Sequence, residues 1–211
     1  DLAVQSVGGI TSGVYPTDSA RQLVYLVNDS DTQFLFLEND EQLDKYLSVS
    51  DQMPKLKKVI VYEKDGLIDF DDPRVMFLTD LYEVGKIELE KKSGIFEKEI
   101  EAGKSEDTSI LIYTSGTTGE PKGVEITGNN IMFSISAGGR SLPVFDNDEQ
   151  LCFLPLCHIL ERLISVFQPI GAGSVINFAE SSETVFDNLQ EVSPTIFTAV
   201  PRVWERIYSR V

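Results

Sequence analysis

The chain has 211 residues, 42% of them hydrophobic, which is typical of a globular protein large enough to bury a core. The 34 acidic residues outnumber the 18 basic ones, and the formal net charge of −16 should repel nucleic acid and anionic membrane surfaces. No signal peptide is visible, and no apolar run reaches the roughly 18 residues of a membrane span.

The two cysteines, Cys152 and Cys157, match no metal-site spacing and form no disulfide framework. A reducing, intracellular setting follows, so we expect a cytoplasmic protein with no membrane span and no nucleic-acid partner. The first residue is Asp1, and Pro201–Val211 has the pattern of a helix that is cut off. Both ends are interpreted as cuts within a longer protein, whose other parts leave peripheral membrane contact open.

The first half of the chain alternates between helical and strand-like patterns. Near-continuous apolar runs predict buried strands over Thr32–Glu38 and Lys58–Glu63. Apolar spacing and capping residues predict helices over Asp1–Gly13, over a segment that Asp18 or Ser19 caps, over Asn39–Leu47, and from Asp80 towards Glu90 behind a Thr79 cap. Glu63–Pro73 is polar and predicts a loop, and a charged stretch runs on to Glu106.

The second half repeats this alternation. The predicted strands are Ser109–Ser115, the short Val124–Thr127, Gln150–Leu156, Ser174–Phe178 and Thr195–Val200. The predicted helices are Asn129–Ala137, His158 to about Phe167, Glu183–Val192, and a last one that begins at Pro201. The pattern indicates an α/β fold of mostly parallel sheets flanked by helices. The polar stretch Glu101–Asp107 is the best boundary and divides the chain into residues 1–106 and 107–211.

One segment, YTSGTTGEPKGVEIT (Tyr113–Thr127), has the composition of an anion-binding loop. It leaves the carboxyl end of a predicted strand, which is where ligands bind in open α/β sheets. Its glycines let the backbone come close to a ligand, so that N–H groups can surround an anion. The hydroxyl groups of four residues and the charge of Lys122 add donors; the four are Thr114, Ser115, Thr117 and Thr118.

Two simpler interpretations of this segment fit less well. The common phosphate-binding loop has the pattern G-x-x-x-x-G-K-[ST] and runs into a helix. Here Lys122 is followed by Gly123 and a strand-like VEIT. An ordinary glycine-rich turn would explain one or two glycines, but not a hydroxyl cluster followed by a lysine.

The sequence YTSGTTGEPKGV resembles the signature of the adenylate-forming enzymes, which include acyl-CoA synthetases, peptide-synthetase adenylation domains and luciferases. LPLCHILER (Leu154–Arg162), VPRVWERI (Val200–Ile207) and GVYPTDSARQLVYLVNDSDTQFLFLEND resemble the long-chain fatty acyl-CoA synthetase branch. The resemblance covers essentially the whole chain and implies part of the large amino-terminal domain. One departure is Gly128 in EITGNN, where the family usually has histidine.

The resemblance implies a ligase that uses ATP, Mg²⁺ and coenzyme A with a fatty acid. A carboxylate attacks the α-phosphate of ATP to give an acyl-adenylate and pyrophosphate, and the thiol of coenzyme A then takes the acyl group. The implied ATP-binding residues are Thr114, Ser115, Gly116, Thr117, Thr118, Gly119 and Lys122. Thr114 is also the implied magnesium contact, and the implied catalytic residues are Thr117, Lys122 and His158.

Three side chains outside this loop are implied to bind the acid: His158, Arg202 and Trp204. Each has a simpler interpretation, since a lone histidine is often structural and Trp204 could merely pack a helix beside a surface ion pair. A Cys157–His158 dyad is disfavoured because adjacent residues seldom face each other. The acidic Asp69–Pro73 stretch could hold a metal, but a solvated loop is the better interpretation.

The adenine-binding, ribose-binding and carboxy-terminal lysine segments of the family have no counterpart in these 211 residues. We therefore expect a catalytically incomplete piece of a long-chain fatty acid–CoA ligase. The alternatives are an adenylate-forming enzyme that acts on another acid, a non-catalytic nucleotide-binding module, and a free-standing ATPase.

Overall fold

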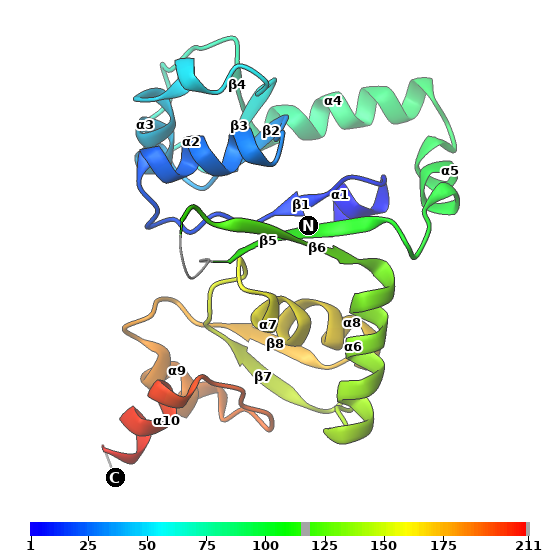
Figure 1. Cartoon of the computed structure of the whole chain (residues 1–211), viewed down its shortest axis with the longest axis vertical. Coiled ribbons are helices and arrows are strands. Elements are labelled where there is room, and N and C mark those ends of the chain that lie inside the picture. The colour runs from blue at the N-terminus through cyan, green and yellow to red at the C-terminus, as the bar shows by residue number, and fades with distance from the viewer. Residues whose placement is uncertain (115–118, 210–211) are drawn as a thin grey trace. The chain divides into compact units, whose positions relative to one another are not determined.

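The computed structural model of the protein describes residues 1–114 and 119–209 (Figure 1). The chain forms two compact units, Asp1–Lys104 with Ser109–Val124, and Ser105–Thr108 with Glu125–Val211. This division assigns the signature segment up to Val124 to the first unit, whereas the sequence-based division at 106/107 assigns it to the second part. The domain boundaries therefore remain a prediction.

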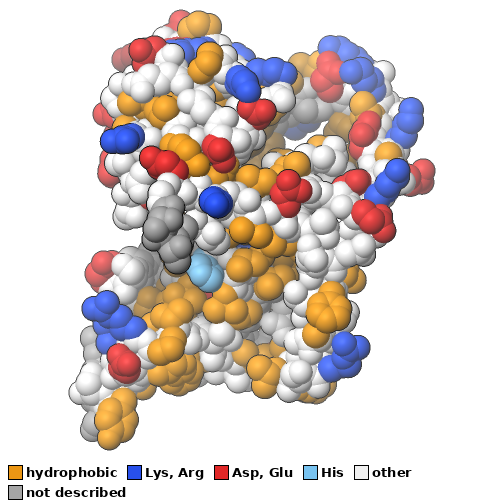
Figure 2. Space-filling model, in the orientation of Figure 1, with side chains coloured by type: hydrophobic (Ala, Val, Ile, Leu, Met, Phe, Trp, Pro, Cys, Tyr) orange, Lys and Arg blue, Asp and Glu red, His pale blue; other side chains and the backbone are white. Residues whose placement is uncertain are grey.

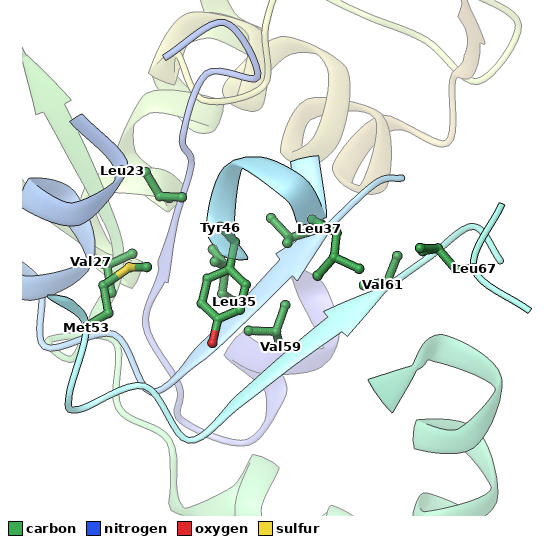
Figure 3. Packing of buried hydrophobic residues seen from close by; sticks show 10 residues of the cluster. Leu23, Val27, Leu35, Leu37, Tyr46, Met53, Val59, Val61 and Leu67 are labelled. Atoms are coloured by element: carbon green, nitrogen blue, oxygen red, sulfur yellow. The ribbon is translucent and has the colours of Figure 1, made fainter. Parts of the chain in front are cut away.

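A parallel sheet forms the centre of the first unit. Its strands are β2 (Phe34–Leu37), β3 (Lys58–Val61) and β4 (Val75–Phe77), in that order. The β3 residues Val59 and Val61 are fully buried, as the near-continuous apolar run predicts for a central strand. Figure 3 shows how side chains from this sheet and from neighbouring helices pack into one hydrophobic core.

Two helices supply most of the remaining core. α2 (Ala20–Asp29) buries Leu23, Leu26 and Val27, whose i, i+3, i+4 spacing forms one apolar face. The predicted cap is confirmed, because Ser19 Oγ accepts from the Gln22 N–H and the Gln22 side chain accepts from the Ser19 N–H. α3 (Asp40–Leu47) buries Leu43 and Tyr46 and precedes the short turn η1 (Ser50–Gln52).

The sequence misjudged three features that follow. α4 (Leu78–Lys91) starts before Thr79, and the cap is the Asp80 carboxylate, which accepts from the Phe77 N–H at 3.2 Å. The three-residue β4 was missed because it runs directly into this helix. α5 (Ile95–Ala102) was missed because it has no buried residue and its sequence is dominated by charge.

A second sheet has the order β1 (Thr11–Ser12), β5 (Thr108–Thr114) and β6 (Lys122–Thr127). β1 pairs in parallel with β5, and this pairing overturns the prediction of one helix over Asp1–Gly13. α1 (Leu2–Ser6) ends early, because Gly8 has φ +74° and the chain then extends along β5. Long-range strand pairing here prevails over local helical spacing.

The second unit contains a parallel pair, β7 (Glu149–Cys152) and β8 (Val175–Phe178). Its helices are α6 (Gly128–Ser141), α7 (Ile159–Arg162), the π-helical turn η2 (Leu163–Phe167), α8 (Gln168–Ala172), α9 (Val185–Val192) and α10 (Pro201–Tyr208). The strand pairs β1–β5, β2–β3, β3–β4 and β7–β8 are all parallel, which confirms the predicted α/β fold of mostly parallel sheets.

Several boundaries in this unit differ from the prediction, and one predicted strand is not formed. β7 ends at Cys152 instead of Leu156, and the helical run after His158 continues to Ala172. Thr195–Val200 is no strand, since only Ile196 bridges to Gln150. The Thr195 hydroxyl replaces a second ladder contact, because it accepts from the Glu149 N–H and donates to the Asp148 carboxylate.

Among the described residues, no helix combines the length and apolar character needed to cross a bilayer.

The start of α6 explains why glycine occupies position 128, where the resembled family usually has histidine. A Cβ atom built on Gly128 would lie 3.1 Å from the carbonyl oxygen of Ser105 and 3.3 Å from its Cα. That backbone is held in place, because Ser105 O accepts from the Asn129 N–H at 2.7 Å. Any side chain at position 128 would press on it.

We therefore predict opposite effects for two glycine substitutions in α6. Gly139→Ala should stabilise the protein by about 0.5–1 kcal/mol, because its Cβ meets nothing within 4 Å and alanine favours helix. Gly128→Ala should destabilise it by about 1 kcal/mol through overpacking against Ser105. Chemical unfolding of both variants checks this, and an equal gain in stability for both would contradict it.

Candidate functional site

The signature segment connects the end of β5 to the start of β6. Of its predicted ligand-binding residues, Thr114, Gly119 and Lys122 are described, and all three are exposed. Gly119 has φ +109°, a conformation that residues with a side chain rarely adopt. The other predicted residues, Ser115, Gly116, Thr117 and Thr118, lie outside the described residues.

Two tyrosine hydroxyls fasten both stems of this segment to α2. The Tyr113 hydroxyl, on β5, donates to the Asp29 carboxylate at 2.7 Å. The Tyr25 hydroxyl, on α2, donates to the carbonyl of Pro121 at 2.7 Å. The segment is thus held on either side at its base, so its stems have fixed positions relative to α2.

The surroundings of both phenols raise their pKa values. Burial, followed by the hydrogen bond to Asp29, raises the pKa of Tyr113. Burial, followed by the charges of Asp29 and Glu120, raises the pKa of Tyr25. Both phenols therefore keep their protons, and their hydrogen bonds, well into the alkaline range. The role of Tyr25 was not found from the sequence, since it lies 96 residues from Pro121.

His158 lies at the N-terminus of α7, in the second unit. Its Nδ1 accepts from the Leu160 N–H at 3.2 Å and caps the helix. In the neutral ring the proton must then be on Nε2, which is a hydrogen-bond donor. Figure 2 shows the imidazole, the chain's one histidine, at the surface in pale blue. His158 therefore has a structural role as a cap and still presents a free N–H donor.

Trp204 lies on α10 and joins a row of aromatic rings. Its Nε1–H donates to the carbonyl of Ala199 at 3.2 Å, and its ring meets Phe197 edge-on with centroids 5.3 Å apart. Phe197 in turn stacks on Phe153 at 5.5 Å. Phe153 follows β7 directly, so the row connects the segment before His158 with Trp204. Arg202 is exposed on α10.

Two charged side chains that follow His158 on α7 are buried. Glu161 and Arg162 are only 2% and 4% exposed, and burial lowers the pKa of the Arg162 guanidinium. Burial, followed by the neighbouring Glu161 carboxylate, raises the pKa of the Cys152 thiol to about 12. The sequence signal for this burial is that the charged pair Glu161–Arg162 lies within the apolar run LPLCHILERLISVF.

Neither cysteine is in a disulfide, and His158 Nδ1 bonds to the Leu160 amide, so the arrangement gives no support to a Cys157–His158 dyad. Across residues 1–114 and 119–209, no three His, Cys, Asp or Glu side chains gather in a group that could hold a metal ion. The acidic Asp69–Pro73 stretch lies within this range.

Comparison with known proteins gives a consistent family. The model of the AMP-binding enzyme family matches residues 1–211. The human long-chain-fatty-acid–CoA ligase ACSBG2 is 33% identical over 214 residues, a match that covers 97% of this chain and 30% of the human protein. The chain thus spans less than a third of the length of that relative.

Solved structures share the fold at low sequence identity. The anthranilate CoA ligase AuaEII, solved with anthranoyl-AMP, superposes with a TM-score of 0.71 at 18% identity, over 92% of this chain and 36% of its own. ATP-bound MatB from Rhodopseudomonas palustris has a TM-score of 0.66 at 15% identity, over 94% of this chain and 36% of its own. With a family model that matches its whole length, the chain belongs to the AMP-binding enzyme family.

Proposed function

We propose that the protein carrying this chain is an ATP-dependent long-chain fatty acid–CoA ligase. The acid carboxylate displaces pyrophosphate from ATP to form an acyl-adenylate, and the thiol of coenzyme A then displaces AMP to form the thioester. Support comes from the family match over the whole chain and from relatives of this name at about 30–33% identity.

One observation carries the proposal: the signature segment leaves the exposed end of β5 between two stems that α2 fastens. Residues at the carboxyl end of a strand are placed to bind ligands in this class of fold. We assign the phosphates of ATP to this segment, with contacts from Thr114, Ser115, Gly116, Thr117, Thr118, Gly119 and Lys122. The fastened stems support this assignment, because a binding segment whose two ends already have fixed positions costs less to order around an anion.

Lys122 and Thr117 are the proposed catalytic donors of this segment. Negative charge moves onto pyrophosphate as the α-phosphate bond breaks, and donors aimed at that charge lower the barrier. A local cation is needed, because the formal charge of −16 opposes a polyanionic ligand. Lys122 is exposed at the first position of β6 and provides that charge.

The family implies a magnesium ion, and the residues present suit a weakly held one. Mg²⁺ prefers oxygen ligands and often binds through one or two protein groups together with substrate phosphates. Thr114 offers one exposed hydroxyl at the end of β5, and the described residues contain no dedicated metal cluster. When bound, the ion would neutralise phosphate charge; Thr114 would be its contact in this chain. Coenzyme A is proposed as the second substrate.

His158 is proposed to orient the acid. Because Nδ1 caps α7, the Nε2–H is the group that can donate to the carboxylate or to the acyl-adenylate. Trp204 is proposed as an apolar wall for the acyl chain, and Arg202, on the same helix, as a further acid contact. Each buried methylene of a fatty acid contributes about 0.8 kcal/mol, so apolar walls of this kind favour long chains.

The first prediction concerns Lys122→Ala in the full-length protein. Acyl-CoA formation from a long-chain acid should fall by about 10²–10³-fold in kcat, because one preorganised donor to the developing charge is lost. Lys98→Ala, at an exposed position of α5, is the matched control and should leave the rate unchanged. Product formation by thioester assay measures both.

An unchanged rate in Lys122→Ala would contradict the assigned role of this residue. A panel of long-chain, short-chain, aromatic and amino acids identifies an adenylate-forming enzyme that acts on another acid. A protein that binds ATP but forms no thioester with any acid would instead be a non-catalytic nucleotide-binding module.

The second prediction concerns the tyrosine that fastens the first stem. Tyr113→Phe should lower the free energy of unfolding at neutral pH by about 1 kcal/mol, because a hydrogen bond to a partly exposed carboxylate is lost. An unfolded tyrosine titrates near pH 10, and the folded pKa of Tyr113 is higher. Its contribution to stability is therefore complete below about pH 10 and is lost as the pH rises towards the folded pKa.

Chemical unfolding between about pH 8 and pH 12 checks this, since the variant should lose stability less steeply above pH 10 than the wild type does. Tyr208→Phe is the control, because that ring is 86% exposed on α10. Identical pH dependence in Tyr113→Phe and the wild type would show that the Asp29 contact does not hold the stem.

A further inference from the structure

A buried carboxylate closes the segment between β7 and α7. Glu161 is 2% exposed. Its Oε1 accepts from the backbone N–H of Phe153 at 3.2 Å and from the hydroxyl of Ser165 at 3.0 Å. Phe153 is the first residue after β7, so the carboxylate takes over the N–H at the point where the strand ends.

A thiol lies beside this carboxylate. Burial, followed by the Glu161 side chain, raises the pKa of the Cys152 thiol to about 12, so the thiol stays protonated and adds no second negative charge beside the carboxylate. A carboxylate buried to this extent is expensive unless hydrogen bonds compensate it. Two donors from separate segments, the Phe153 N–H just after β7 and the Ser165 hydroxyl in η2, therefore converge on one acidic side chain.

The position of Glu161 connects it to the proposed acid contact. His158 is three residues before it and caps the same short helix through Nδ1. The backbone N–H of His158 also donates to the carbonyl of Pro155 at 3.0 Å, and this bond makes a tight turn before the helix. The Glu161–Phe153 hydrogen bond thus closes a loop of residues 153–161, and His158 lies within that loop.

The same bond also fixes the start of the aromatic row. The N–H that Glu161 holds belongs to Phe153, and the Phe153 ring stacks on Phe197, which meets Trp204. The one carboxylate therefore restrains both ends of the proposed acid site, His158 on one side and the rings on the other. Burial strengthens these restraints, because little water can reach the carboxylate to compete for its hydrogen bonds.

We propose that Glu161 is a positioning residue for the acid site. Its carboxylate holds the segment from Phe153 to His158 so that the Nε2–H of His158 and the ring row of Phe153, Phe197 and Trp204 keep one arrangement. This inference rests on the proposed function, since it assigns a role in the binding of a long-chain acid. Glu161 itself touches no reacting atom.

Three variants separate this role from a general loss of structure. Glu161→Leu removes both oxygens at similar volume, whereas Glu161→Gln keeps Oε1 as an acceptor for Phe153 and Ser165. Ser165→Ala removes one donor and leaves the charge. Glu191→Leu, at an exposed position of α9, is the matched control.

The kinetic test uses the full-length protein. Glu161→Leu should raise the KM for a long-chain acid about tenfold and leave the KM for ATP unchanged, because the phosphate-binding segment keeps its own contacts to α2. Glu161→Gln should remain within about twofold of the wild type for both substrates, because its amide oxygen still accepts both bonds. Should Glu161→Leu fail to fold, Ser165→Ala carries the test with a smaller rise, about threefold, in the acid KM alone.

A spectroscopic test does not depend on activity. The chain has one histidine and one tryptophan, so the ring nitrogens of His158 and the emission of Trp204 are unambiguous signals. In the 211-residue chain, Glu161→Leu or Ser165→Ala should move the nitrogen resonances towards those of a free imidazole and shift the emission to the red. Glu191→Leu should change neither signal.

The positioning role would be overturned if Glu161→Leu left both spectroscopic signals and the KM for the acid unchanged. An equal rise in the KM for both substrates would overturn it as well. Where Glu161→Leu does not fold, the same outcomes apply to Ser165→Ala. A wild-type protein that ligates no fatty acid would overturn the proposed function instead, and the spectroscopic signals would then decide the structural part of the inference alone.

Discussion

A backbone N–H that leaves a sheet must find another acceptor, and at the end of β7 that acceptor is the buried carboxylate of Glu161. The strand therefore stops at Cys152, although the apolar sequence continues to Leu156. The chain then turns back through Pro155 and enters α7 under the cap of His158. The exposed imidazole, the buried acid and the aromatic row that leads to Trp204 all depend on this one termination.

The first unit places its exposed segment in a different way, through hydrogen bonds that two phenols donate. Tyr113 at the end of β5 and Tyr25 on α2 hold the two stems of the signature segment through Asp29 and Pro121. α2 can carry out this role because its apolar face is committed to the core and its first turn is capped by Ser19. In both units, a helix that is well packed on one side provides the polar groups that place an exposed segment.

Features that depend on neighbouring residues were readable from the sequence, and features that depend on distant ones were not. The buried strands β2 and β3, the Ser19 cap and the proline start of α10 follow from short patterns, and so does the signature segment. The pairing of β1 with β5 joins residues about 100 positions apart, and it overruled a local helical pattern at Asp1–Gly13. The local pattern predicts that Thr195 lies in a strand, yet it contacts β7 through its hydroxyl, which bonds to Asp148 and Glu149. His158 was found as a candidate through its motif, but its cap and the burial of Glu161 required the tertiary structure.

The central claim is that the signature segment holds the phosphates of ATP while an acid attacks the α-phosphate. Its most direct measurement is the exchange of labelled pyrophosphate into ATP by the full-length protein, with and without a long-chain fatty acid and in the absence of coenzyme A. The account predicts exchange that requires the acid, because the reversible first half-reaction forms an acyl-adenylate and pyrophosphate. Release of inorganic phosphate and ADP from ATP, with no acid-dependent exchange, would contradict it.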